Sequence, residues 1–146
     1  MSAQPFLRPA PAADPRHAAL LEHARHPRNR RDLDAATHHG SGSNALCGDS
    51  VSVSLVVDGD VLREIAFKER SCNVCKASAS MMTELVHGRP LAEVRALCAD
   101  FRRWVAEGDA AWTPPDALAP LALLRERSAR HRCLTLAWEA LADALG

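Results

Sequence analysis

The sequence predicts an α+β fold, in which a small antiparallel sheet of about three strands is covered on one face by helices. Residues 51–67 alternate apolar and small polar side chains as strands do, with turn residues in the middle. From residue 73 onward the apolar residues recur at helical spacing instead. Because the strands come together and are followed by a run of helices, separate layers are favoured over alternating strand–helix units.

The strand signal is strongest for a hairpin. One face of the first strand carries Val51, Val53, Leu55 and Val57. Asp58-Gly59-Asp60 supplies the turn, and a second strand follows over 61–67. A lone hairpin is marginally stable, so a third strand or a helical cover is required, and the segment before Cys47 can supply that strand. Residues 28–43 contain few apolar residues and are expected to form a long, mobile connection.

Helices are predicted over about 15–25, from 73 to just before Gly88, over about 90–107 and over 131–145, with short helices within 116–127. Asp14 is a suitable N-cap for the first, and Pro27 ends it because the residue before proline avoids the α region. Residues 1–14 are rich in proline and alanine and are expected to form a disordered tail. The remainder, 15–146, has the length of a single domain.

Composition narrows the functional classes. The 18 lysines and arginines balance 18 aspartates and glutamates, so no nucleic-acid partner is expected. No apolar run approaches the roughly 18 residues of a membrane span, and the N-terminus lacks a signal-peptide stretch, so we expect a cytoplasmic protein with no membrane partner. In that reducing compartment, five cysteines more often bind metal or do chemistry than form disulfides.

Three cysteines and one aspartate are the main candidates for a functional site. Cys47 and Asp49 flank a glycine that lets the backbone turn sharply. Cys72 and Cys133 lie near the starts of predicted helices, where the partial positive charge of the helix terminus favours a thiolate. Three thiolates and one carboxylate suit a tetrahedral zinc ion, and the same ligands can hold iron in an iron–sulfur cluster.

Other residues near these positions leave alternatives open. Residues 130–132, Arg-His-Arg, add positive charge beside Cys133, and a neutral His131 can also ligate a metal. Cys72 and Cys75 have the Cys-x-x-Cys spacing of both redox and zinc proteins, so a thiol oxidoreductase remains an alternative. A zinc-stabilised interaction module without sulfur chemistry is another. Cys98 lies on an apolar helical face and is assigned to the core.

Three motifs, in this order, resemble the NifU/IscU/SufU family of iron–sulfur cluster assembly proteins. They are Asn44-x-x-Cys47-Gly48-Asp49, then Cys72 followed by Ala-Ser-Ala-Ser-Met-Met-Thr over 77–83, then Arg130-x-x-Cys133 followed by Leu-Thr-Leu-Ala-Trp. The resemblance runs from about residue 23 to 145. An extra helical region over 88–129, between the second and third motifs, is similar to the SufU type rather than the IscU type.

This resemblance implies an α+β fold and a metal site formed by Cys47, Asp49, Cys72 and Cys133. The implied cofactor is zinc, or alternatively iron or a [2Fe–2S] cluster. The implied partners are a pyridoxal-phosphate-dependent cysteine desulfurase, which supplies persulfide sulfur, and downstream apo iron–sulfur proteins. By analogy Cys47 and Cys133 carry the persulfide, and Arg130 stabilises the anionic site. The chain would then be a scaffold or sulfur-transfer partner rather than a stand-alone enzyme.

The sequence departs from the family pattern at three positions. Ala45 stands where proline is usual before the Cys-Gly-Asp turn, and Ser71 stands where glycine usually precedes the second cysteine. Cys75 is an extra thiol at a position where SufU-like proteins tend to have serine. The resemblance therefore assigns no role to Cys75.

Overall fold

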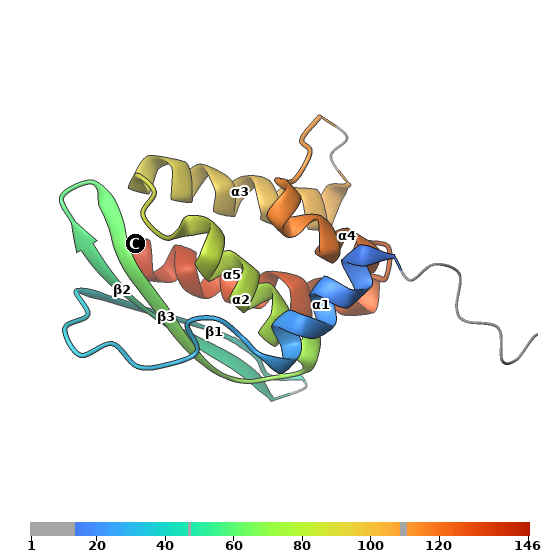
Figure 1. Cartoon of the computed structure of the whole chain (residues 1–146), viewed down its shortest axis with the longest axis horizontal. Helices are drawn as coiled ribbons and strands as arrows, with labels where there is room; N and C mark the ends of the chain where they lie inside the picture. Colours follow the sequence, from blue (N-terminus) through green and yellow to red (C-terminus); the bar gives the residue numbers. More distant parts are fainter. Residues whose placement is uncertain (1–13, 47, 109–110) are drawn as a thin grey trace, which may run out of the picture.

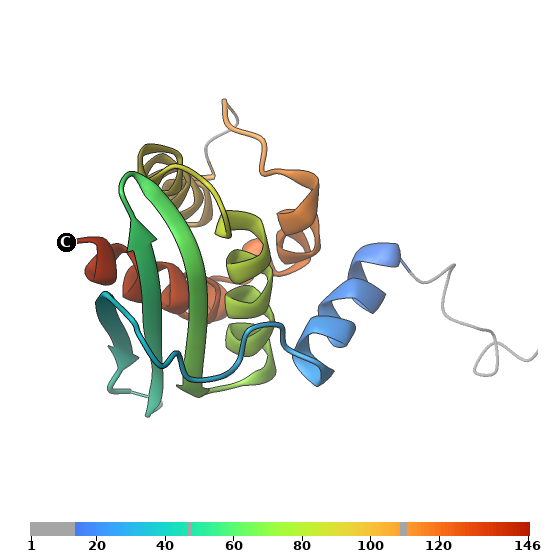
Figure 2. The same ribbon diagram turned by 60° about the vertical axis from the view of Figure 1, so that its left-hand side comes forward.

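A computed structural model describes residues 14–46, 48–108 and 111–146. Its antiparallel sheet has the order β1 (His38–Asn44), β2 (Asp49–Asp58), β3 (Val61–Arg70). The helices are α1 (Pro15–Arg25), α2 (Asn73–Val86), α3 (Leu91–Glu107), α4 (Ala122–Arg125) and α5 (His131–Leu145), with short 3-10 helices η2 (Asp116–Leu121) and η3 (Ser128–Arg130). Helices α2 and α5 cover one face of the sheet (Figures 1 and 2). The predicted α+β architecture is confirmed.

Strand β1 lacks the apolar alternation by which a strand is usually recognised in a sequence. The expectation of a mobile connection over 28–43 is wrong for its last part, because β1 pairs with β2 from His38, opposite Leu55, to Asn44, opposite Asp49. The prediction that the segment before Cys47 supplies a third strand is confirmed. Apolar alternation is missing because β1 packs through its backbone: a Cβ on Gly42 would lie 2.9 Å from the carbonyl oxygen of Leu136 in α5.

The hydrophobic core lies between the sheet and helices α2 and α5, and α3 packs against α5 from outside (Figure 1). Phe101 of α3 stacks on Trp138 of α5 with ring centroids 4.4 Å apart. Cys98 is 3% exposed, so its assignment to the core is confirmed. The methionine pair of α2 is equally buried. Cys72 and Cys133 are partly buried and pack against this core.

Helix boundaries follow their local signals. Helix α1 begins at Pro15 after an N-cap, Asp14, whose carboxylate accepts the backbone N–H of Arg16 at 2.9 Å. Gly88 and Gly108 follow α2 and α3 with φ of 78° and 68°, the left-handed conformation typical of a helix C-terminus. The tail expected over 1–14 lies outside the described residues except for this capping aspartate. No helix in the described ranges is long and apolar enough to cross a membrane.

Candidate metal centre

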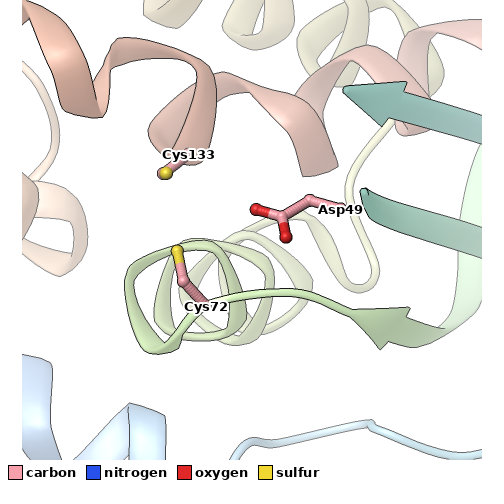
Figure 3. Close-up of side chains that lie close together, drawn as sticks. All are labelled: Asp49, Cys72 and Cys133. Carbon is pink, nitrogen blue, oxygen red and sulfur yellow. The ribbon is translucent and has the colours of Figure 1, made fainter. Parts of the chain in front are cut away.

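Three of the four predicted ligands meet at one end of the sheet. Asp49 is the first residue of β2, Cys72 immediately precedes α2, and Cys133 lies in the first turn of α5. The carboxylate oxygen and the two Sγ atoms all lie within 4.8 Å of one another. The sulfur atoms point toward each other and the carboxylate points toward both (Figure 3). The fourth predicted ligand, Cys47, lies outside the described residues.

The donor set fits the metals that the sequence suggests. Zinc–sulfur bonds of about 2.3 Å in a tetrahedron place two sulfur ligands roughly 3.8 Å apart, and the three ligand atoms here all lie within 4.8 Å of one another. All three side chains are half-buried, so they are partly desolvated and still accessible. Two thiols and a carboxylate supply three of four positions, and thiolate ligands suit zinc and iron–sulfur clusters alike. One further ligand would complete a tetrahedral site.

Cys72 owes its place to the way β3 leads into α2. Cys72 is itself the N-cap of α2, and Asn73 is the first residue of the helix. No side chain caps this helix end, which leaves the first-turn N–H groups and their partial positive charge facing the site. Cys72 therefore lies at the positive end of the α2 dipole.

A nearly buried carboxylate fixes this junction. The Glu69 side chain is 3% exposed, accepts hydrogen bonds from Arg30 Nε at 2.8 Å and Ser71 Oγ at 2.9 Å, and lies 3.8 Å from Lys76 Nζ. Burial raises the pKa of Glu69, but the bonds from Arg30 and Ser71 and the charge of Lys76 outweigh it, so the pKa is lowered. Glu69 therefore joins the end of β3 to the segment around Arg30 and to the first turn of α2. Sequence reasoning missed it.

The helices that carry Cys72 and Cys133 are joined directly. Ser78 Oγ donates to the carbonyl oxygen of Leu134 at 2.7 Å and accepts the indole N–H of Trp138 at 3.2 Å. Its neighbours Ala77 and Ala79 are fully buried, and their small side chains let α2 approach α5 closely. The distance between the two thiols depends on this crossing.

A tight turn leads from β1 toward Asp49. The N–H of Gly48 donates to the carbonyl oxygen of Asn44 at 2.9 Å, and the Asn44 side-chain oxygen accepts the N–H of Leu46 at 3.2 Å. Gly48 has φ of 72°, a left-handed conformation that favours glycine. The predicted role of this glycine as a turn residue is confirmed. The turn leaves Leu46 98% exposed.

Arg132 ties the end of β1 to α5. Its guanidinium donates to the carbonyl oxygen of Ser43 at 2.6 Å and to both carboxylate oxygens of Glu139 at 2.6 and 2.7 Å. Because Ser43 is one residue from the Asn44 turn and Arg132 is one residue from Cys133, this contact holds two parts of the site together. Sequence analysis treated Arg132 only as a nearby positive charge, and no motif pointed to the contact.

Two thiols near the site, Cys133 and Cys75, have raised pKa values. The pKa of Cys133 is raised to about 11, first by burial and then by the neighbouring Cys72, and hydrogen bonding and charge from exposed Arg130 oppose the rise. Arg130 therefore lies where it was expected to stabilise an anionic site. Burial also raises the pKa of Cys75 to about 12, against a hydrogen bond from Ser71. With no exposed surface, Cys75 is poorly suited to thiol exchange.

Other candidate ligands point elsewhere. Nε2 of His131 lies 2.5 Å from the carbonyl oxygen of Arg125, a contact that uses this nitrogen as a donor. Within the described part of the chain, Asp49, Cys72 and Cys133 form the single group of three or more His, Cys, Asp or Glu side chains close enough to share an ion. The alternative in which His131 ligates the metal is therefore not supported.

Comparison with known proteins identifies the family. Residues 16–102 match the NifU-like N terminal domain. The chain belongs to this family. It is 32% identical over 129 residues to the iron-sulfur cluster assembly scaffold protein IscU of Streptococcus pyogenes serotype M1, covering 88% of this chain and 80% of that protein.

Other relatives of this NifU-like chain belong to the same group of proteins. It is 29% identical over 124 residues to the zinc-dependent sulfurtransferase SufU of Bacillus subtilis, covering 84% of this chain and 83% of that protein. A crystal structure of a nitrogen-fixing NifU-like protein (N-terminal) from Brucella abortus superposes with a TM-score of 0.77 at 26% identity, covering 87% and 89% of the two chains. The chain is thus a member of the IscU/SufU family of iron–sulfur cluster assembly scaffolds.

Proposed function

We propose that this protein binds zinc through Cys47, Asp49, Cys72 and Cys133 and accepts persulfide sulfur from a pyridoxal-phosphate-dependent cysteine desulfurase for iron–sulfur cluster assembly. The observation that carries the proposal is the convergence of a carboxylate and two thiols from three separate elements within 4.8 Å. Iron, or a [2Fe–2S] cluster on its way to apo iron–sulfur proteins, is the alternative occupant, because the same ligands suit it.

Bound zinc would hold Cys133 as a thiolate at neutral pH, which its raised pKa otherwise opposes. Sulfur transfer then requires one cysteine thiolate to attack the outer sulfur of the donor's persulfide. A new S–S bond forms on the acceptor, the donor's S–S bond breaks, and the donor cysteine leaves as a thiolate, with no net oxidation. Arg130, beside Cys133, compensates the negative charge that remains at the site.

Cys47 is the first acceptor in this proposal. Leu46 and Gly48 on either side of it are exposed, whereas Cys72 and Cys133 are half-buried. A partner protein reaches an exposed turn with less rearrangement than it reaches thiols at the starts of two packed helices. Asp49, Cys72 and Cys133 keep three ligands in place while this thiolate is engaged with the donor.

The test combines metal analysis with a sulfur-transfer assay on the full chain. The purified protein should contain about one zinc, raise the turnover of a cysteine desulfurase, and carry a persulfide that alkylation and mass spectrometry locate on Cys47 or Cys133. The Cys47→Ser variant should lose stimulation. Cys98→Ala, which removes a core thiol remote from the site, should keep it.

The outcomes separate the alternatives. Zinc binding without any effect on desulfurase turnover or sulfur transfer would favour a zinc-stabilised interaction module and refute the proposal. Assembly of a [2Fe–2S] cluster on the protein with iron and sulfide, and no zinc requirement, would favour the scaffold form. A Cys72–Cys75 disulfide that exchanges with thioredoxin-like partners would favour the oxidoreductase, although the burial of Cys75 argues against it.

A further inference from the structure

Leu46, the residue before Cys47 in the sequence, has the most exposed large apolar side chain of the described residues. Leu46 is 98% exposed, whereas the next two, Leu21 and Val61, are 39% and 38% exposed. The turn itself does not require leucine, because its hydrogen bonds use the backbone of residues 46 and 48 and the side chain of Asn44. An apolar side chain held fully in water contributes nothing to folding and becomes favourable only when a partner covers it.

Positive side chains flank this leucine on the same end of the molecule. Exposed Arg70, at the end of β3, pairs in register with Ser50, the residue after Asp49. Exposed Arg130 contacts Cys133, and half-exposed Arg132 reaches Ser43 beside the turn. Nearby carboxylates are already engaged: Glu69 is buried among its partners, and Glu139 accepts both bonds from Arg132.

We propose that Leu46 is an apolar anchor for the sulfur donor, and that Arg70, Arg130 and Arg132 form a positive rim around it. The inference rests on the proposed function and identifies the partner surface: an apolar pocket beside the persulfide-bearing cysteine, edged by carboxylates. An apolar side chain entering a pocket at the centre of a contact, with charges at its edge, is the arrangement that supplies most binding energy in protein interfaces. Because Leu46 precedes Cys47, seating the leucine delivers the acceptor.

The experiment measures desulfurase turnover against the concentration of this protein. Full burial of a leucine predicts that Leu46→Ser raises the half-maximal concentration about ten- to a hundredfold. Leu46→Met should restore it to near the wild-type value. Leu21→Ser removes a partly exposed leucine on α1, away from the site, and should have no effect. Zinc content, measured in every variant, should equal that of the wild type.

A matched pair on β3 tests the rim. Arg70→Glu reverses the charge at the site end of the strand, whereas Arg63→Glu does so near the hairpin end, where Arg63 pairs with Asp58. Arg70→Glu should raise the half-maximal concentration severalfold at low salt and less at high salt, because screening weakens exposed charge pairs. Arg63→Glu should change it less than twofold.

Each outcome decides between the claims. If the wild type stimulates the desulfurase and Leu46→Ser does so at the same concentration within twofold, the anchor is refuted and the proposed function stands. If Arg70→Glu behaves as Arg63→Glu does, the rim is refuted. If the wild type neither stimulates a desulfurase nor receives sulfur, the proposed function fails, and the anchor fails with it.

Discussion

Replacing Gly40 by alanine tests whether the contact between β1 and α5 sets the site. A Cβ at this position would fall closer than 3.0 Å to three backbone atoms, the carbonyl oxygen of Ala140 and the nitrogen and Cα of Ala144. Real Cβ atoms essentially never approach other atoms so closely, and backbone atoms cannot rotate away as a flexible side chain can. Either β1 or α5 must therefore move.

The size of the effect follows from this movement. Restoring ordinary contact, which begins near 3.4 Å, requires a shift of about 1 Å between β1 and α5. Overpacking of this kind costs about 1–3 kcal/mol. Alanine recovers about 0.4–1 kcal/mol by restricting the unfolded chain. We expect Gly40→Ala to lower the free energy of unfolding by about 1–2 kcal/mol.

Urea denaturation monitored by tryptophan fluorescence measures this loss, and zinc content measured on the same preparation reports on the site. Gly42→Ala should show a smaller effect, since a Cβ there would lie 2.9 Å from one backbone oxygen. Ser41→Ala, on the exposed face between the two glycines, is the control and should change stability by less than about 0.5 kcal/mol. An unfolding free energy for Gly40→Ala equal to that of the control would refute the reasoning.

Further predictions concern other contacts around the core and the site. Ser78→Ala leaves the Trp138 indole N–H without its partner and should cost about 1–3 kcal/mol in urea denaturation. Burial, and then the charge of Arg28, lowers the pKa of His23 below its ordinary 6.5. The unfolded chain therefore binds the proton first as the pH falls, and stability should decrease below about pH 6.5. His23→Gln should flatten this dependence, measured as urea midpoints at pH 7.5 and 5.5. Arg132→Gln should weaken zinc binding in a competition titration with a chromophoric chelator, because it releases Ser43 from α5. Chelation should lower the thermal midpoint while the far-ultraviolet circular dichroism of the folded chain persists.

The sequence predicts most of the fold because its local signals agree with the tertiary structure. The hairpin alternates apolar and polar residues, and helices α1 and α5 occupy 15–25 and 131–145 as predicted. Strand β1 lacks this alternation for a physical reason. Its glycines pack backbone against helix, and this close approach requires the absence of side chains, so the apolar periodicity that normally indicates a strand cannot be present there.

The candidate site was predictable in its ligands but not in the contacts that hold them. Asp49, Cys72 and Cys133 carry recognisable chemistry at the starts of elements, and the structure brings them together. Ser78, Glu69 and the Arg132 bridge were not recognisable, because a serine, a glutamate or an arginine in a helix or strand is ordinarily a solvated residue. Their partners lie far along the chain, so only the folded arrangement reveals them.

The position of the site relative to the core bears on the proposed function, in which the protein holds a metal and gives up sulfur or a cluster. In small zinc domains the metal supplies much of the folding free energy, and its removal unfolds the chain. Here Trp138, Phe101 and Phe67 are buried in a core that the sheet and helices form, whereas the candidate ligands lie at the ends of β2, α2 and α5, with Cys72 and Cys133 packed against the core only from outside. Changes in ligation therefore alter the ends of three elements without unfolding the sheet and helices behind them. A scaffold needs that separation, because a site that exchanges ligands or releases a cluster cannot also be what keeps the protein folded.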